Sequence, residues 1–136
     1  MQDSPIYIRE FFFLQGVMIE IKTIGGYGEV GKNCTAIRVD GDVVIIDMGV
    51  HLENYIRHTE DEDIKNISAD ELIEQKAVPD IDKLGDWTED VRAIIPTHAH
   101  LDHIGAIPFL SNDFDADILC TPFTKEVLEE ILRNES

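Results

Sequence analysis

The sequence predicts a mixed α/β domain, because segments of strand character and segments of helix character both recur along its 136 residues. Two β-rich runs flank an Asp-Gly pair, which is a strong signal for a β-hairpin. Further along, an apolar run of strand type leads directly into three closely spaced histidines. The composition, 43% hydrophobic and 29% charged, is typical of a globular chain with one modest core.

The first regular element is a strand that begins just after Met18, where Ile19, Ile21 and Ile24 are separated by polar residues. Residues 1–17 do not fit this pattern. We therefore interpret 1–17 as an N-terminal extension and Met18 as a candidate for the true start of the chain.

A glycine-rich loop, Gly25-Gly26-Tyr27-Gly28-Glu29-Val30-Gly31-Lys32-Asn33, follows this strand and contains both G-x-G-x-x-G and G-x-x-x-x-G-K. In nucleotide-binding proteins a helix directly after such a loop holds the phosphate. Here the expected hairpin strands, 34–39 and 42–47, come next, and Asn33 stands where a P-loop needs Ser or Thr. We predict that some of the glycines form tight turns with positive φ, and they also allow the backbone to approach a substrate closely.

The charge is strongly negative, with 11 basic residues against 28 acidic ones and a net charge of −17. Residues 51–90 hold 13 acidic and four basic residues, which indicates either a solvated surface insert or a protein adapted to high internal salt. Nucleic-acid binders usually carry a basic surface instead. Within this stretch, Ser68-Ala69-Asp70-Glu71 is a capping box and predicts a short helix to about Lys76, before Pro79.

The second half of the chain continues the alternation. A buried strand is expected at 91–96, a short helix at 106–110 and a strand at 116–120. A helix is expected from Pro122 to about Arg133, with Thr121 as its N-cap. Its apolar face comprises Val127, Leu128, Ile131 and Leu132.

No stretch approaches the roughly 20 apolar residues of a membrane span, and the run Phe11–Leu14 is too short and wrongly flanked for a secretory signal. Cys34 and Cys120 form no C-x-x-C pair, so we expect two reduced, buried thiols. These features predict a cytoplasmic protein with no membrane partner.

The main functional signal is the run His98-Ala99-His100-Leu101-Asp102-His103 at the end of a predicted strand. In an extended segment, side chains at i and i+2 point the same way, so His98 and His100 can converge on one ion. Asp102 and His103 follow the turn and can serve a second ion. Nitrogen and carboxylate ligands without thiolates suit zinc, with manganese or iron less favoured. Two such ions activate a shared water for hydrolysis.

Asp47 ends another predicted strand and has two readings from sequence. It either orients a ligand imidazole through the imidazole's free N–H, or it forms a turn before Gly49. His51 and His58 lack comparable partners and are interpreted as ordinary surface residues.

The run from Thr97 to Gly105 resembles motif 2 of the metallo-β-lactamase superfamily, and Asp47 resembles its motif 1. The loop Gly25–Asn33, together with Gly105-Ala106-Ile107-Pro108, is similar to the ribonuclease J family of β-CASP nucleases, most of all its archaeal branch. The resemblance extends over about residues 18–134. It implies an αββα sandwich with two zinc ions and hydrolysis of RNA, usually 5′-to-3′ from a 5′-monophosphate end.

By this resemblance, His98 and His100 bind the first zinc, and Asp102 and His103 bind the second. Asp102 also helps to hold the attacking hydroxide, and Asp47 orients the ligands. Manganese is the alternative metal, RNA is the expected partner, and a homodimer of the complete enzyme is a further expectation. The substrate-binding residues stay unassigned.

The family also needs a further histidine, a metal-bridging aspartate and a β-CASP domain, and no histidine follows His103. We therefore expect residues 18–136 to be the N-terminal part of the metallo-β-lactamase domain, inactive as a nuclease alone. Two alternatives stay open. One is hydrolysis of a small ester or thioester, although Gly105-Ala106 replaces the Gly-Gly typical of those branches. The other is a metal-binding fragment without enzymatic activity.

Overall fold

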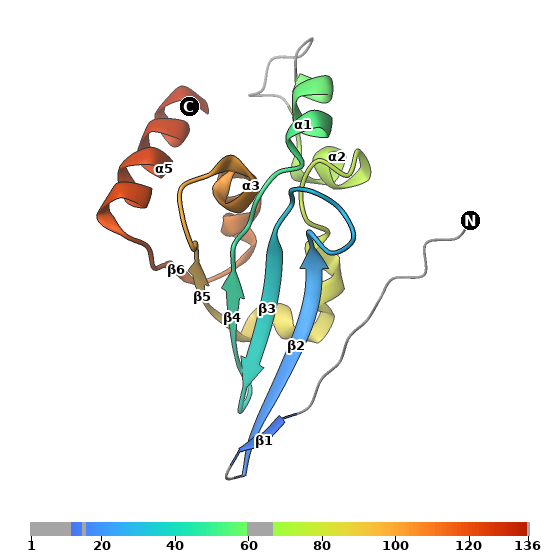
Figure 1. The fold of residues 1–136 in the computed structure, drawn as a ribbon, viewed down its shortest axis with the longest axis vertical. Helices are drawn as coiled ribbons and strands as arrows, with labels where there is room; N and C mark the ends of the chain where they lie inside the picture. The colour runs from blue at the N-terminus through green and yellow to red at the C-terminus, as the bar shows by residue number, and fades with distance from the viewer. Residues whose placement is uncertain (1–11, 15, 60–66, 136) are drawn as a thin grey trace, which may run out of the picture.

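The described residues 12–14, 16–59 and 67–135 form one mixed sheet with helices packed against one face in this computed structural model (Figure 1). Six strands of this part follow the spatial order β1-β2-β3-β4-β5-β6. They are β1 (Phe12–Leu14), β2 (Val17–Gly25), β3 (Cys34–Val39), β4 (Asp42–Ile46), β5 (Val91–Ile95) and β6 (Asp117–Ile118). The predicted α/β class is therefore confirmed.

The helical segments connect the strands and cover the core. They are α1 (Leu52–Thr59), α2 (Ala69–Glu74), the 3-10 segment η2 (Ile81–Asp90), α3 (Leu101–Ile104), α4 (Ile107–Leu110), the 3-10 turn η3 (Ser111–Asp113) and α5 (Pro122–Glu135). No helix in the described ranges is long and apolar enough to cross a membrane.

The direction of pairing changes once across the sheet. Each neighbouring pair from β1 to β4 is antiparallel. The pairs β4–β5 and β5–β6 are parallel. The carboxyl ends of β4 and β5 therefore meet at one edge of the sheet, and Asp47 N donates to Ile95 O across this edge at 3.3 Å. In open α/β sheets, this is the edge at which ligands bind.

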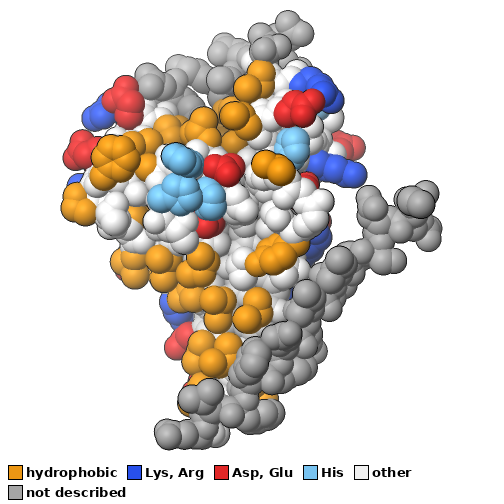
Figure 2. Space-filling model, in the orientation of Figure 1, with side chains coloured by type: hydrophobic (Ala, Val, Ile, Leu, Met, Phe, Trp, Pro, Cys, Tyr) orange, Lys and Arg blue, Asp and Glu red, His pale blue; other side chains and the backbone are white. Residues whose placement is uncertain are grey.

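The two faces of the sheet differ in burial. On the helix side, Ala36, Val43, Ile45 and Ile94 are fully buried. The opposite face carries half-buried apolar side chains, of which Ile37 pairs with Val44. Figure 2, in the same orientation, shows hydrophobic side chains along the strands on the face toward the viewer. The described residues thus form one helix layer and one sheet layer of the expected αββα sandwich.

Most of the expected local elements are present. The hairpin turns at Asp40 and Gly41, which both have positive φ (49° and 100°), as a two-residue turn of this type requires. The Ser68–Glu71 capping box is formed in both directions at the start of α2. Thr121 Oγ1 accepts from Thr124 N at 3.3 Å and caps α5. The strand expected at 116–120 is shorter, with only Asp117–Ile118 paired to β5.

The reading of residues 51–90 as a solvated insert is wrong for much of this stretch. It contains α1 and η2, neither of which was expected, and it contributes five fully buried apolar residues to the core: Leu72, Ala77, Val78, Leu84 and Trp87. Because acidic residues dominate its composition, the stretch reads as a surface segment. Its buried apolar residues nevertheless belong to the core, whereas Leu52 and Ile56 of α1 are exposed.

The acidic charge of this stretch is partly neutralised by the sheet. Trp87 of η2 packs against two basic side chains, with Lys22 Nζ 4.3 Å and Arg38 Cζ 5.5 Å from its ring centroid. The same bases pair with acids of η2, as Arg38 contacts Asp90 at 3.2 Å and Lys22 contacts Asp86 at 3.8 Å. Basic residues of β2 and β3 therefore anchor the acidic crossover.

The proposed N-terminal extension falls largely outside the described residues, which exclude 1–11 and 15. Phe12–Leu14 pairs antiparallel with the start of β2. The prediction that Met18 is the true start stays a prediction.

A short segment after β4 connects the glycine loop to the histidine motif through its backbone. Met48 N donates to His103 O at 2.8 Å, and Gly49 N donates to Asn33 O at 3.1 Å. Further backbone bonds join Val50 N to Leu101 O, Ala106 N to Met48 O and Lys32 N to Val50 O. The approach is so close that a Cβ at Gly49 would lie 1.7 Å from Asp102 O.

We expect Gly49→Ala to destabilise the chain by at least about 3 kcal/mol, because backbone rather than a flexible side chain occupies the space. The control is Gly28→Ala, where φ is positive but no atom lies within 4 Å of the new Cβ. Strain alone should cost that variant about 1–2 kcal/mol. Thermal or urea unfolding measures both, and equal losses would contradict the close approach at Gly49.

Candidate metal centre

Asp47 is the buried carboxylate at the junction of β4 and β5, with 7% of the residue exposed. Its φ is 61°, a left-handed conformation that aspartate tolerates better than most residues. Its oxygens accept from Thr97 N at 2.7 Å and from Thr97 Oγ1 at 2.9 Å. The third partner is His103 Nδ1, at 2.7 Å. Of the two readings from sequence, the structure thus places Asp47 against a histidine of the motif.

These contacts define which ring nitrogen of His103 carries the proton and which carries the lone pair. The carboxylate can only accept, so Nδ1 of His103 carries the proton and donates it to Asp47. The lone pair then lies on Nε2, which accepts a hydrogen bond from Asn33 Nδ2 at 3.3 Å and lies 3.5 Å from Asp102 Oδ2.

The same logic applies to His98. Thr97 Oγ1 has one hydrogen, which it donates to Asp47, so its oxygen accepts from His98 Nδ1 at 3.0 Å. The Nε2 lone pair of His98 is therefore available as well. Neutral imidazoles with Nδ1–H held and Nε2 free are the form in which histidine binds a metal.

Three imidazoles gather at this edge. The ring of His98 lies 4.0 Å from that of His103 and 4.6 Å from that of His100, between centroids. Figure 2 shows histidines clustered at the surface beside an acidic side chain. The predicted residues His98, His100, Asp102 and His103 are thus brought together. Asp102 and His103 lie in the four-residue helix α3, which was not expected from the sequence.

The donor chemistry fits a divalent metal, because imidazole nitrogen and carboxylate oxygen meet without thiolates. Within the described ranges, however, no three His, Cys, Asp or Glu side chains converge as a group that could hold an ion. The structure therefore shows two imidazoles with their lone pairs on Nε2 beside a carboxylate, and the lone pair of His103 accepts from Asn33. The assignment of individual ligands stays a prediction.

Asn33 is a residue of this site that sequence reasoning used only to reject a P-loop. Its Nδ2 donates to Asp102 O at 2.9 Å, and its backbone N donates to the same oxygen at 3.1 Å. The end of the glycine loop is thus hydrogen-bonded to the backbone of the histidine motif. The loop is followed by β3 and not by a helix. This arrangement agrees with the rejection of a nucleotide loop.

His51 is a second residue that the sequence did not assign to the site. It lines a cavity of about 590 Å³ together with the glycine loop, the start of α1 and the histidine motif. The lining residues are Val30, Gly31, His51, Leu52, Glu53, Ala99, His100, Leu101 and Asp102. Sequence reasoning interpreted His51 as an ordinary surface residue, and the structure adds that it lies beside the histidine motif in this cavity. Because His51 lies far from the motif along the chain, no local sequence pattern connects the two.

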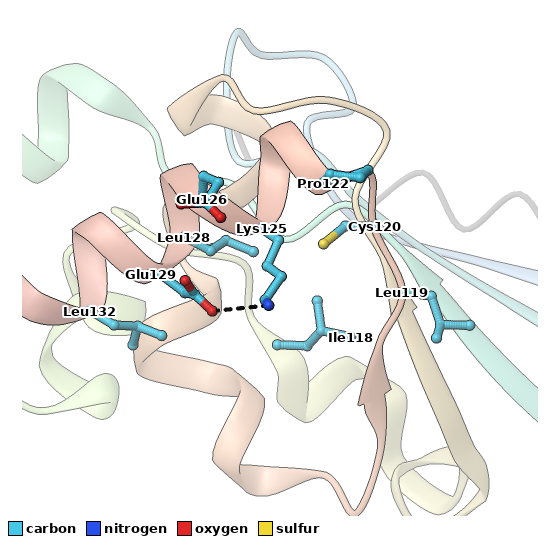
Figure 3. Close-up of a pocket in the computed structure, with 9 residues that line it drawn as sticks. All are labelled: Ile118, Leu119, Cys120, Pro122, Lys125, Glu126, Leu128, Glu129 and Leu132. Atoms are coloured by element: carbon cyan, nitrogen blue, oxygen red, sulfur yellow. Dashed lines mark ion pairs between the residues drawn. The ribbon is translucent and has the colours of Figure 1, made fainter.

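A second cavity, of about 670 Å³, lies between β6 and α5 (Figure 3). Its walls are mainly apolar, including Ile118, Leu119 and Leu128, and Lys125 pairs with Glu129 at 3.4 Å beside it. None of the predicted site residues lines it. We therefore place the candidate site at the histidine cluster, although this other cavity is larger.

Cys34 lies close to the site but is chemically protected. It is 2% exposed, and burial raises the pKa of its thiol to about 12, with a further contribution from the negative charge of Asp47. Cys120 is half-buried, and both thiols are free. The expected pair of unlinked thiols is confirmed.

Comparison with known proteins shows the family of the chain. Residues 27–134 match the family described as the metallo-beta-lactamase superfamily. The chain is 43% identical over 117 residues to a ribonuclease J of Methanocaldococcus jannaschii, covering 86% of this chain and 26% of that protein. It is 40% identical over 119 residues to a ribonuclease J of Pyrococcus abyssi, covering 87% and 26%. Ribonuclease J2 of Bacillus subtilis is 32% identical over 116 residues, covering 85% and 18%. The chain thus spans about a quarter of the length of its archaeal relatives.

We expect Asp47→Asn to weaken zinc binding about 10- to 100-fold, because the amide offers one acceptor where three donors converge and releases the His103 ring. Stability should fall by about 1–3 kcal/mol. Competition with a chelator and urea unfolding measure the two effects. The matched control is Asp42→Asn at the exposed start of β4, and equal behaviour of the two variants would contradict the role of Asp47.

We expect alkylation by iodoacetamide at pH 8 to modify Cys120 and spare Cys34 in the folded chain. With a pKa of about 12, only about one Cys34 thiol in 10⁴ is ionised at that pH. The raised pKa also means that stability falls as pH rises from 9 toward 12, because unfolding releases the proton. Mass spectrometry of digested peptides reads the modification, and equal labelling would show that Cys34 is accessible.

Proposed function

The chain belongs to the metallo-β-lactamase superfamily, and from that membership we propose that this protein is a metal-dependent ribonuclease that hydrolyses phosphodiester bonds of RNA. The observation that carries the proposal is the Asp47–His103 hydrogen bond within a cluster that also holds His98 and Asp102. The similarity to ribonuclease J of two archaea supports RNA as the substrate.

We further propose two zinc ions, with manganese as the alternative metal. His98 and His100 hold the first, and Asp102 and His103 hold the second. The lone pairs on Nε2 of His98 and His103 support this assignment, and ligation by His103 requires Asn33 Nδ2 to give up its 3.3 Å contact with Nε2. When bound, the metal lowers the pKa of a water and neutralises charge that develops on the attacked phosphate.

The chain's own residues perform the positioning. Asp47 keeps the proton of His103 on Nδ1 and so keeps the lone pair needed for ligation on Nε2. Thr97 does the same for His98 through its hydroxyl oxygen. The Asp102 carboxylate, 39% exposed, accepts a hydrogen bond from the attacking hydroxide and directs it toward phosphorus. Asn33 holds the backbone of Asp102 while this occurs.

The negative charge of the chain repels RNA, so we propose that a basic surface elsewhere in the protein grips the substrate. We also propose 5′-to-3′ cleavage, supported by the likeness of the glycine loop and the histidine motif to ribonuclease J. A cytoplasmic location is part of the same proposal.

The test is activity of the full-length protein, loaded with zinc or manganese, on 5′-monophosphorylated RNA and on a small thioester. We expect RNA to be degraded from its 5′ end and the thioester to stay intact. Asp102→Asn should lower kcat by at least about 10²-fold, because the amide weakens both the ligation of the metal and the hydrogen bond to the hydroxide. The control, Asp113→Asn in the exposed turn η3, should match the wild type. Thioester turnover with intact RNA would overturn the proposal.

A further inference from the structure

The position of His51 beside the metal centre is set by the backbone. Its N–H donates to Ala77 O at 2.8 Å, and Lys32 N donates to the preceding carbonyl, Val50 O, at 3.0 Å. Gly31 packs directly against it, since a Cβ there would lie 3.1 Å from His51 Cα. The His51 side chain therefore projects from firmly hydrogen-bonded backbone and not from a mobile loop tip.

In its ring, Nδ1 is hydrogen-bonded within the chain and Nε2 is available to a ligand. His51 Nδ1 accepts from Asn54 N at 3.2 Å and caps the first turn of α1. A neutral ring that accepts at Nδ1 carries its proton on Nε2. His51 therefore lines the cavity with a ring whose remaining nitrogen is a hydrogen-bond donor, whereas the histidines of the motif retain Nε2 lone pairs.

The other walls of this cavity are apolar although they reach the surface. Val30 is 87% exposed, Leu52 47% and Leu101 43%. Glu53, the acidic group on the α1 side, is paired with Arg57 at 2.7 Å, which reduces its repulsion of an anion. Exposed apolar side chains around a cavity that also holds polar groups are typical of a ligand site.

The cavity is continuous with the metal centre, because His100 and Asp102 form part of its wall. Its volume, about 590 Å³, lies within the range of small-molecule sites and is sufficient for one nucleotide. Nucleobases are commonly held between apolar side chains, while polar groups contact the sugar and phosphate.

We propose that this cavity binds the nucleotide of RNA next to the cleaved phosphodiester. The base lies against Val30, Leu52 and Leu101, and His51 Nε2–H donates to an oxygen of the sugar–phosphate backbone. This inference rests on the proposed ribonuclease activity and adds the residues that hold the substrate.

The test uses steady-state cleavage of a short 5′-monophosphorylated oligoribonucleotide by the full-length, metal-loaded protein. His51→Asn removes the ring, but asparagine still caps α1, so the helix start is retained. We expect KM to rise about tenfold, as for loss of a hydrogen bond to a charged group, with kcat within about twofold. The matched control, His58→Asn on the same helix, should leave both parameters unchanged.

The apolar wall is tested separately with Leu52→Asp, which should raise KM about tenfold or more. Its control is Ile56→Asp, one turn further along α1, exposed to a similar degree (42%) and outside the cavity wall. The control adds the same charge to the same helix, so it measures general repulsion of RNA.

The outcomes separate the two proposals. If the wild-type protein does not cleave RNA, the proposed function is wrong, and this inference falls with it. If RNA is cleaved but His51→Asn leaves KM unchanged, or lowers kcat or metal content instead, only the nucleotide cavity is refuted. The same holds if Ile56→Asp raises KM as much as Leu52→Asp.

Discussion

The arrangement of this molecule depends on one buried carboxylate, Asp47, and the three donors that converge on it. The backbone N–H and hydroxyl of Thr97 and the ring N–H of His103 come from a segment about fifty residues away. A buried charge is tolerated only where hydrogen bonds replace lost water, so this carboxylate requires the histidine motif beside it. The same bonds keep the lone pairs of His98 and His103 on Nε2. The same interaction thus stabilises this edge of the sheet and orients the proposed metal ligands.

The backbone around Asp47 reinforces this arrangement. The segment Met48–Val50 lies between the end of the glycine loop and helix α3 and bonds to both. Gly49 permits the approach, because no side chain fits between it and Asp102 O. As a result, backbone hydrogen bonds join the glycine loop, the end of β4 and the histidine motif. Preorganised ligands of this kind are what a metal-dependent hydrolase needs, since ordering them at each turnover would raise the barrier.

Charge is distributed unevenly for a protein proposed to act on RNA. The acidic crossover between β4 and β5 turns toward the sheet, where Lys22 and Arg38 contact both its acids and Trp87. Near the cavity, Glu53 is paired with Arg57. Total charge is therefore a poor guide to the local field at a site, because it does not register such pairing. An acidic chain can still present a cavity with polar and apolar walls next to its proposed metal ligands.

The sequence by itself determined the local features: the hairpin at Asp40-Gly41, the capping box of α2, helix α5, and the residues of the histidine motif. Each of these signals lies within a few neighbouring residues, where sterics and capping act. Only the tertiary structure decided that Asp47 faces His103, that Asn33 holds Asp102, and that His51 joins the cavity. It also buried Trp87 from a segment that reads as acidic surface. These contacts join residues far apart in sequence, and no periodicity or spacing encodes them, since they depend on which strands pair and in what register.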